Sequence, residues 1–428
     1  MSTTPISPPY SLQRIVVVGA SLAGLRACET LRQEGFAGEI TLVGDEAEMP
    51  YDRPPLSKAF LAGEWDADRI RLRKPDAFES LDLRLRLGVR AAALNSGERT
   101  VELADGTTLP YDGLVIATGA SPRRLPDQPA ATGVLAMRTL ADSVELRRLL
   151  TLQRDRPARL VVIGAGFIGL EVAATARGLG AEVTVLEGAD APLIRGLGAE
   201  MGTAVVAMHA AHGVDVRCAV QVTAIETDGA AAPTASGVRL GDGTVLPADV
   251  VVVGVGVSPA VDWLAHSGLT LRDGIVCDAT LNAGIPGVYA AGDVARWPNA
   301  TFSGHDDEEM RVEHWTNASE QGAAAAANLL RSARGETPEP FRTVPFFWSD
   351  QYDQRIQFIG RAHGGDDIHV IAGTPGDGPF AALYGWQGRL RGALGVSMPK
   401  LVMRFRPLVA EQASWEAALA RAAELTSS

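Results

Sequence analysis

Residues 159–187 read RLVVIGAGFIGLEVAATARGLGAEVTVLE, and their pattern is sufficient to infer the fold class. Arg159–Ile163 is apolar and rich in β-branched residues, which predicts a buried strand. A helix is expected over 167–179, and Ala181–Leu186 has the pattern of a second strand. A strand, a helix and a strand in this order predict a βαβ unit and therefore a parallel sheet.

Three glycines at the junction of the first strand and the helix form a G-x-G-x-x-G motif. Gly164 permits a tight turn, Gly166 lets a pyrophosphate approach the backbone, and Gly169 lets the helix pack on the strand. The phosphates then lie at the positive N-terminus of the helix, where N–H groups are unpaired. Ile168, inside the motif, belongs to the same expected dinucleotide-binding set.

The residue that closes the second strand predicts which dinucleotide is bound. Glu187 lies near the ~20-residue distance at which a carboxylate accepts the ribose hydroxyls and repels a 2′-phosphate. NADH is therefore expected rather than NADPH. Arg195 lies further downstream and is included in the expected NADH set, although an arginine is also the residue type that could hold a 2′-phosphate.

The same pattern occurs near the N-terminus. Arg14–Gly19 predicts a strand, Ser21–Gly35 a helix and Glu39–Val43 a second strand. Its motif departs from the consensus, since Gly19 and Gly24 flank Ser21 and Ala23, and serine replaces the second glycine. Serine is small and its hydroxyl can donate to a phosphate oxygen, and Asp45 occupies the ribose-carboxylate position. The chain is thus predicted to be an α/β protein with two Rossmann-like dinucleotide-binding modules.

Composition and charge disfavour several classes of partner. The 428 residues carry a formal net charge of -12, which disfavours nucleic acid and anionic membranes. Apolar stretches are far shorter than a membrane span, and the N-terminus has no apolar signal core. Two local clusters of basic residues fit either a solvated surface or a docking face for an acidic partner: Arg69, Arg71, Arg73 and Lys74, and Arg84, Arg86 and Arg90.

The cysteines and histidines predict neither a thiol relay nor a metal site. Cys28, Cys218 and Cys277 are far apart in sequence, which fits a reducing cytoplasm, and Cys28 is expected in the core. His209 and His212 have i, i+3 spacing but no further recognisable ligand, so we expect surface roles for them.

Two further segments identify a superfamily by resemblance. Ala117-Thr118-Gly119 follows a buried strand, and Gly292-Asp293 ends another. With the repeated module, the chain resembles the FAD/NAD(P)H pyridine nucleotide-disulfide reductase superfamily. The resemblance implies that the first motif holds FAD, that Thr118 and Gly119 mark the crossing between modules, and that Asp293, after Gly292, binds the ribityl chain.

The resemblance also implies two Rossmann-like dinucleotide-binding domains (glutathione-reductase-like) plus a C-terminal α+β domain. Residues 1–118 and 247–328 form a discontinuous FAD domain in this arrangement. Residues 119–246 form the NADH domain, and residues 329–428 form the C-terminal domain.

Three motifs indicate which family within the superfamily the chain resembles. Disulfide reductases relay electrons through cysteines, but residues 49–58 contain none. Residues 53–58 (RPPLSK), 313–318 (EHWTNA) and 347–352 (FWSDQY) are similar to the oxygenase-coupled ferredoxin reductases, the putidaredoxin reductase-like family. The resemblance implies an FAD-dependent ferredoxin–NAD(+) oxidoreductase. Hydride would pass from NADH to FAD, and single electrons would then pass to an iron–sulfur ferredoxin that serves a cytochrome P450 or Rieske oxygenase.

The family also implies site residues. Lys58 is expected near the flavin and paired with Glu171, and we take these two as catalytic. Further FAD contacts are expected from residues that match family positions, namely Arg53, Ala91, Arg138 and Trp315. Trp348 fits either a place near the flavin ring or a place in the core.

Two other functions share these motifs. One is a flavoprotein reductase of rubredoxin or another acceptor. The other is an NADH-binding flavoprotein that acts through partner binding.

Overall fold

The computed structural model describes residues 12–302 and 309–427. The chain divides into two compact units, each built from separate segments. The first comprises Met1–Asp52, Arg71–Ser121 and Ser258–Pro345, and the second comprises Arg53–Ile70, Pro122–Val257 and Phe346–Ser428. The chain passes between the units five times, and two of these crossings lie in β8 (Ala120–Pro122) and β17 (Val257–Pro259). The three-domain boundaries expected from the resemblance stay a prediction.

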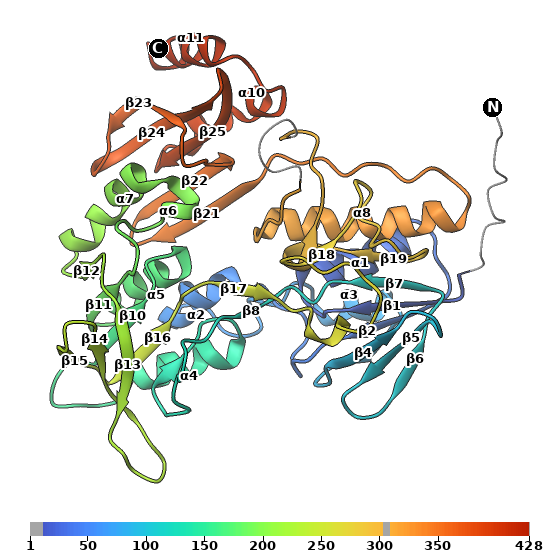
Figure 1. Ribbon diagram of the computed structural model, residues 1–428, viewed down its shortest axis with the longest axis horizontal. Helices are drawn as coiled ribbons and strands as arrows, with labels where there is room; N and C mark the ends of the chain where they lie inside the picture. The colour runs from blue at the N-terminus through green and yellow to red at the C-terminus, as the bar shows by residue number, and fades with distance from the viewer. Residues whose placement is uncertain (1–11, 303–308, 428) are drawn as a thin grey trace. The chain divides into compact units, whose positions relative to one another are not determined.

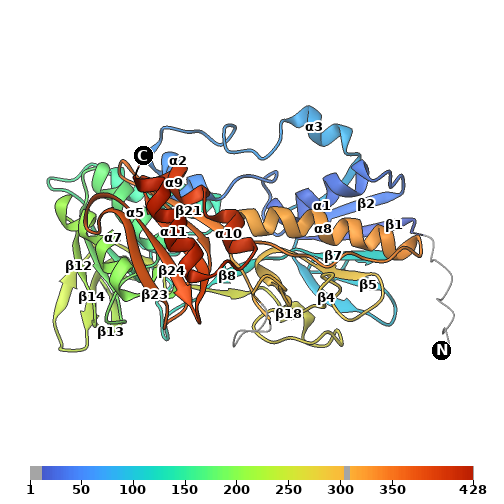
Figure 2. The same cartoon turned by 90° about the horizontal axis from the view of Figure 1, so that it is seen from above.

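A parallel sheet of order β19-β7-β1-β2-β3 forms the centre of the first unit. Helices α1 (Leu22–Gln33) and α8 (Trp315–Ala333) lie side by side against it (Figure 2). A Cβ on Gly322 of α8 would lie 2.2 Å from the carbonyl oxygen of Ala23, so glycine is what allows the two helices to approach so closely. The sheet strands are β1 (Arg14–Val18), β2 (Glu39–Val43), β3 (Leu83–Arg86), β7 (Gly113–Ile116) and β19 (Val288–Ala290).

The first unit also contains smaller elements. Its antiparallel sheet is β4 (Ala91–Asn95), β5 (Thr100–Leu103) and β6 (Thr108–Pro110), and β18 (Ile275–Val276) pairs with β20 (Ala295–Arg296). Its short helices are α3 (Pro75–Ser80), η2 (Asp262–Leu264) and η3 (Gly292–Val294).

A second parallel sheet, of order β12-β11-β10-β16-β9, lies in the second unit (Figure 1). Its strands are β9 (Val134–Leu135), β10 (Arg159–Ile163), β11 (Glu182–Leu186), β12 (Asp215–Arg217) and β16 (Val250–Val253). The associated helices are η1 (Pro54–Ser57), α2 (Ala59–Ala62), α4 (Leu140–Thr151), α5 (Phe167–Gly178), α6 (Ile194–Leu197) and α7 (Ala199–Ala211).

The two modules have the same register, which confirms the predicted repeat. β1 pairs with β2 from Arg14 and Glu39 onward, and β10 pairs with β11 from Arg159 and Glu182 onward, all in parallel. The second to fifth residues of β1 and of β10 are buried, as expected for strands covered on both faces.

The C-terminal part of the second unit is an antiparallel sheet with helices, as expected for an α+β segment. Its strand order is β21-β22-β25-β24-β23. The strands are β21 (Phe346–Gln351), β22 (Gln354–Gly360), β23 (Asp367–Thr374), β24 (Asp377–Trp386) and β25 (Arg389–Val396), and the helices are α9 (Pro399–Met403), α10 (Arg406–Ala410) and α11 (Trp415–Thr426).

One segment with the composition of a linker is part of a sheet. Residues 227–236 include the ends of β13 (Val222–Thr227) and β14 (Ala235–Leu240) and the turn 228–234 that joins them, and β15 (Val245–Pro247) completes a three-stranded antiparallel sheet. Ile225 and Val238 of these strands belong to the buried core beneath the nucleotide module. The Ala-rich stretch is therefore the turn of a hairpin.

Asp366 makes the stability of the C-terminal sheet dependent on pH. Burial raises the pKa of its carboxyl to about 6, so the folded protein favours the protonated form. Above pH 6 the charged group destabilises the fold, and this penalty disappears as pH falls from about 6 to about 4. Asp366→Asn should therefore stabilise the protein at pH 8 by about 1 kcal/mol, a value reduced for solvent screening because the residue is partly exposed.

Urea unfolding of Asp366→Asn and wild type at pH 8 and at pH 4 tests this expectation. Asp367→Asn, at the exposed neighbouring residue, is the control. An equal gain at both pH values would contradict the expectation.

Candidate functional site

The glycine loop of the second unit has the geometry of a dinucleotide cradle. Gly164 has a φ of +108°, and a Cβ there would lie 2.4 Å from the carbonyl oxygen of Gly254. A Cβ on Gly169 would lie 2.3 Å from the carbonyl oxygen of Gly164. Gly166 begins α5 and is open on its outer side, with nothing within 4 Å of a built Cβ. The loop therefore leaves room for a pyrophosphate against the N-terminus of α5.

Glu187 lies beside this loop. Its Oε2 accepts from the Ala165 N–H at 2.8 Å, and its Oε1 accepts from the Ala189 N–H at 2.9 Å. The backbone thus holds the carboxylate at the carboxyl end of β11. Ile168, in the first turn of α5, and Arg195, on α6, are both exposed. The assignment of these residues to NADH stays a prediction.

Replacing Glu187 should change nucleotide preference. Glu187→Gln removes the charge that would repel a 2′-phosphate and weakens the hydrogen bond to ribose. We expect the KM for NADH to rise about tenfold, which corresponds to ~1.4 kcal/mol, and the NADPH rate to rise. Steady-state kinetics with both nucleotides measure this. Glu182→Gln, an exposed glutamate at the opposite end of β11, is the control, and an unchanged NADH/NADPH ratio in Glu187→Gln would contradict the assignment.

The first unit contains the second cradle. Gly19 has a φ of +119°, and a Cβ there would lie 2.0 Å from the carbonyl oxygen of Ala117. A Cβ on Gly24 would lie 1.9 Å from the carbonyl oxygen of Gly19. Ser21 begins α1 with extended backbone and no side-chain capping bond, so its hydroxyl does not satisfy the helix N-terminus itself. This N-terminus therefore retains donors for a phosphate despite the serine replacement.

The other residues expected at FAD in this unit lie around the neighbouring turns. Ala23 is buried under α8, Asp45 is exposed after β2, and Ala91 is buried at the start of β4. Thr118 donates its hydroxyl to the Ala260 carbonyl at 2.9 Å, and the next residue, Gly119, has a φ of +67°.

The Gly292-Asp293 turn is held from two sides. Gly292 N–H donates to Gln321 Oε1 at 2.8 Å, and Arg311 Nη1 donates to the Asp293 carbonyl at 3.1 Å. Gln321 and Asn317 are buried on α8, and Gln321 Nε2 and Asn317 Oδ1 have no hydrogen-bond partner among the described residues. Such buried polar atoms are costly unless another group satisfies them, so they fit a polar cofactor bound beside α8.

Trp315 begins α8 and is the exposed aromatic residue of this region. Its indole Nε1 donates to Asp52 Oδ1 at 2.7 Å. About 37% of the residue is exposed, which leaves an aromatic surface available for contact.

Lys58 and Glu171 form an ion pair within the second unit, as expected. Lys58 Nζ lies 2.6 Å from Glu171 Oε2, and their side chains are 17% and 6% exposed. Ser57 donates its hydroxyl to the same carboxylate at 2.6 Å. Arg53 Nη1 donates to the Arg138 carbonyl at 2.7 Å, so these two expected residues also lie together. Their roles toward the cofactor stay predictions.

The three cysteines are poorly suited to a redox relay. Burial raises the pKa values of Cys28 and of Cys277 to about 12. Burial, assisted by Glu187 and Asp190, also raises the pKa of Cys218. All three are thiols, and a protonated thiol is a weak nucleophile.

No group of three or more potential ligands that could hold a metal ion occurs in residues 12–302 and 309–427. Over the same ranges, no helix combines the length and the apolar character needed to cross a membrane.

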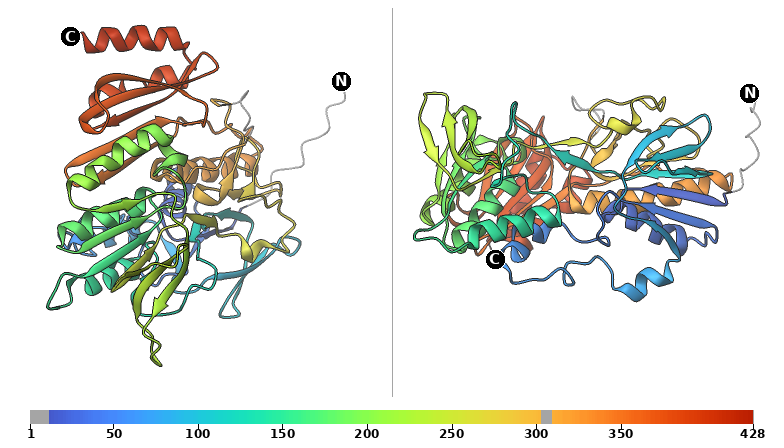
Figure 3. Two further views of the ribbon diagram at one scale, coloured as in Figure 1. Left: turned by 60° about the vertical axis from the view of Figure 1, so that its left-hand side comes forward. Right: turned by 90° about the horizontal axis from the view of Figure 1, so that it is seen from below.

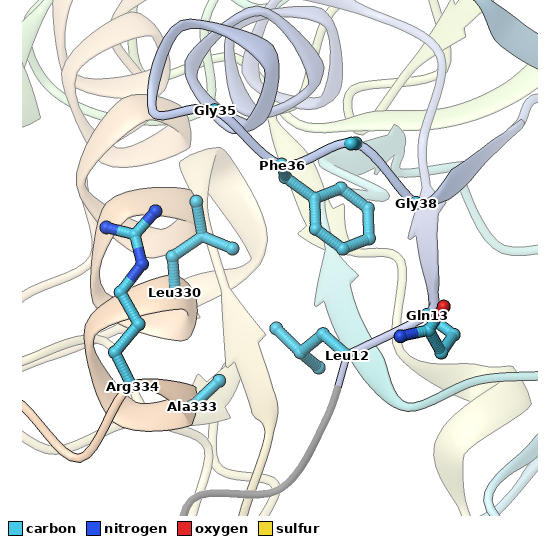
Figure 4. A pocket seen from close by; sticks show the side chains of 9 residues that line it. Leu12, Gln13, Gly35, Phe36, Gly38, Leu330, Ala333 and Arg334 are labelled. Atoms are coloured by element: carbon cyan, nitrogen blue, oxygen red, sulfur yellow. The ribbon is translucent and has the colours of Figure 1, made fainter.

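A pocket in the first unit lies at the wrong end of the sheet for a nucleotide. Leu12, Phe36, Leu330 and Arg334 line it (Figure 4). Leu12 precedes β1 and Phe36 precedes β2, so the pocket is at the amino ends of these strands. Dinucleotides bind at the carboxyl ends of parallel strands, where Gly19 lies.

Comparison with known proteins decides the family. Residues 13–322 match the family model described as pyridine nucleotide-disulphide oxidoreductase, and residues 346–426 match a reductase C-terminal domain. The chain belongs to the pyridine nucleotide-disulphide oxidoreductase family. The family name refers to disulphide reduction, for which such enzymes use cysteines. Residues 49–58 of this chain, the stretch expected to carry them, contain no cysteine.

Individual members of this family are similar over nearly the whole chain. Rhodocoxin reductase of Rhodococcus erythropolis is 39% identical over 93% of this chain and 90% of its own length. The ferredoxin–NAD(+) reductase component of the anthranilate 1,2-dioxygenase system of Burkholderia cepacia is 38% identical over 94% of this chain and 95% of its own. The crystal structure of a covalent putidaredoxin reductase–putidaredoxin complex matches with a TM-score of 0.86 at 34% identity, over 94% of this chain and 93% of that chain.

Sequence reasoning missed one group of residues next to Glu171. His209 was expected at the surface but is fully buried, which is a correction, and its Nε2 lies 2.8 Å from Gln351 Oε1. Ser349 donates to Glu171 Oε1 at 2.6 Å. The signal was present in the motif at 347–352, since alternate residues of a strand share one face and both Ser349 and Gln351 are buried.

Proposed function

We propose that this chain oxidises NADH and delivers electrons one at a time to a small iron–sulfur ferredoxin that serves a cytochrome P450 or Rieske oxygenase. The observation that carries the proposal is the presence of two glycine cradles in one chain whose three cysteines are free and have raised pKa values. Such a protein can hold two dinucleotides but has no reactive sulfur to accept electrons internally. The relatives named as ferredoxin reductases support the same conclusion.

The residues of the chain bind, orient and supply charge. The cradle of Gly19, Ser21 and Gly24 would hold FAD, and the cradle of Gly164, Gly166 and Gly169 would hold NADH. FAD, when bound, accepts a hydride from NADH and returns electrons singly to an iron–sulfur cluster. Lys58 supplies a cation and Glu171 fixes its position. No side chain needs to act as an acid or base for the transfer itself.

The cytoplasm is the proposed location of this reaction. All three cysteines are thiols, which is the form that a reducing compartment maintains. NADH supply in the cytoplasm fits the expected nucleotide preference.

An anaerobic reduction experiment tests the proposal. The purified protein should be yellow, and NADH should bleach it much faster than NADPH. With cytochrome c as final acceptor, added [2Fe-2S] ferredoxin should increase the NADH-dependent rate. Faster reduction with rubredoxin would identify a different acceptor, and no turnover with any acceptor would favour a role through partner binding.

A further inference from the structure

A row of hydrogen bonds, buried except at its partly buried Tyr352 end, extends from Glu171 through the second unit. Ser349 Oγ lies 2.6 Å from Glu171 Oε1, and Gln351 Nε2 lies 3.0 Å from Ser349 Oγ. Gln351 Oε1 lies 2.8 Å from His209 Nε2, and His209 Nδ1 lies 3.1 Å from the Tyr352 hydroxyl. Three of the five side chains, those of Ser349, Gln351 and His209, are fully buried.

The side chains in these hydrogen bonds come from three elements that are distant in sequence. Glu171 lies on α5, His209 on α7, and Ser349 and Gln351 on β21, which lies beside both helices (Figures 1 and 3). β21 begins the C-terminal reductase domain, whereas α5 carries the glycine motif of the nucleotide module. The hydrogen bonds therefore connect the two parts of this unit at the ion pair.

The direction of donation is fixed at every step. A carboxylate only accepts, so Ser349 donates its single hydrogen to Glu171. Ser349 Oγ must then accept from the Gln351 NH₂ group, which leaves Gln351 Oε1 to accept from His209 Nε2–H.

The far end of the row follows from the same reasoning. His209 Nδ1 is then the unprotonated nitrogen, and Tyr352 donates to it. All four donors point toward Glu171, and aligned hydrogen bonds in a low-dielectric interior polarise and strengthen one another.

The surroundings of His209 keep its imidazole neutral. Burial lowers the pKa of His209, so the imidazole is neutral at physiological pH. Tyr352 is held in turn by the ring of His212, which stacks on it with 3.7 Å between centroids and an interplanar angle of 8°.

We propose that Ser349, Gln351 and His209 are positioning residues, which hold the Glu171 carboxylate in register with Lys58 for the reaction with NADH. This proposal rests on the proposed function, because it assigns these residues to the same ion pair. Glu171 Oε2 already accepts from Lys58 and Ser57, and Ser349 holds the other oxygen. Loss of Ser349 would let the carboxylate rotate away from Lys58.

A purely structural role predicts something different. Buried polar networks can often be replaced by apolar residues of similar shape with little loss of stability. If the network only fills space, its variants will change the stability of the protein. They will then change the rate of flavin reduction no more than any other core substitution does.

A double-mutant cycle separates the two cases. Ser349→Ala is made alone and in a Glu171→Gln background, and both the limiting rate of anaerobic flavin reduction by NADH and the urea midpoint of the holoprotein are measured. We expect Ser349→Ala to lower the limiting rate about tenfold with a small change in the NADH concentration at half-saturation. In the Glu171→Gln background the rate effect should vanish, and the shifts in urea midpoint should be less than additive.

Two further variants provide rescue and control. His209→Leu should lower the limiting rate, whereas His209→Gln, whose amide can donate from the position of Nε2, should restore most of it. Tyr384→Phe is the control. It removes a buried tyrosine hydroxyl that donates to the Leu197 carbonyl at 2.8 Å and takes no part in the hydrogen bonds to Glu171, so it should leave the rate unchanged.

The outcomes are distinct from failure of the proposed function. Wild-type protein that NADH does not reduce would overturn the proposed function itself. Active wild-type protein with an unaffected rate in Ser349→Ala, or with the same rate loss in the Glu171→Gln background, would overturn the positioning role.

Discussion

Gly24→Ala protein should be purified without yellow colour, whereas Gly169→Ala protein should be yellow but resist bleaching by NADH. Each substitution places a Cβ against a carbonyl oxygen, at 1.9 Å from that of Gly19 and at 2.3 Å from that of Gly164. Relief requires the helix to move away from its strand, which disrupts the loop that would bind phosphate. A cost of about 3 kcal/mol corresponds to a roughly 100-fold loss of affinity for the nucleotide of that module.

Each variant is a control for the other, because the two modules have the same strand–glycine loop–helix arrangement and only one is altered in each protein. FAD content from absorbance and NADH affinity from titration calorimetry should each fall in one variant only. Gly178→Ala, at the end of α5 where a Cβ meets nothing within 4 Å, should change neither quantity. Loss of flavin from Gly169→Ala with retention in Gly24→Ala would reverse the assignment of the cradles.

Breaking the Lys58–Glu171 ion pair should lower both the rate of reduction by NADH and the stability of the protein. Lys58→Met removes the cation proposed to stabilise negative charge at the reacting centre, so the limiting rate of reduction by NADH should fall about 100-fold, or ~3 kcal/mol. Because Glu171 would then be buried without its partner, stability should fall by about 3–5 kcal/mol. Stopped-flow absorbance and urea unfolding measure the two effects.

A double variant separates rate from stability. Lys58→Met with Glu171→Gln removes both charges and keeps an amide oxygen that can accept from Ser57 or Ser349, so much of the stability should return while the rate stays low. Arg148→Met disrupts an exposed ion pair with Glu145 on α4 and should change neither the rate nor the stability measurably. Recovery of the rate in the double variant would show that the pair only stabilises the fold.

Local patterns were sufficient to predict the parts of the fold that carry the two cradles. β10 and α5 were predicted because a buried parallel strand is a continuous apolar run and the glycine loop that follows is chemically constrained. The hairpin around residues 227–236 was not predicted, since Ala, Pro and Thr give no alternation, and its strands are fixed by burial of Ile225 and Val238 under the neighbouring sheet.

The candidate site was predictable only where function constrains a motif. Lys58 and Glu171 were expected together from the family resemblance, and their ion pair is present. His209 was placed wrongly because its environment depends on Gln351, 142 residues away in sequence. Such contacts arise from the packing of α7 on β21, and the sequence around His209 contains no sign of them.

Counting electrons in a cysteine-free protein tests the central claim most directly. The variant carrying Cys28→Ala, Cys218→Ala and Cys277→Ala is mixed anaerobically with limiting NADH and excess oxidised [2Fe-2S] ferredoxin. Two dinucleotide cradles and no cysteine relay predict that two ferredoxins are reduced per NADH, at a rate close to that of wild type. A wild-type protein that transfers electrons while the cysteine-free protein cannot, despite a full complement of FAD, would contradict the account.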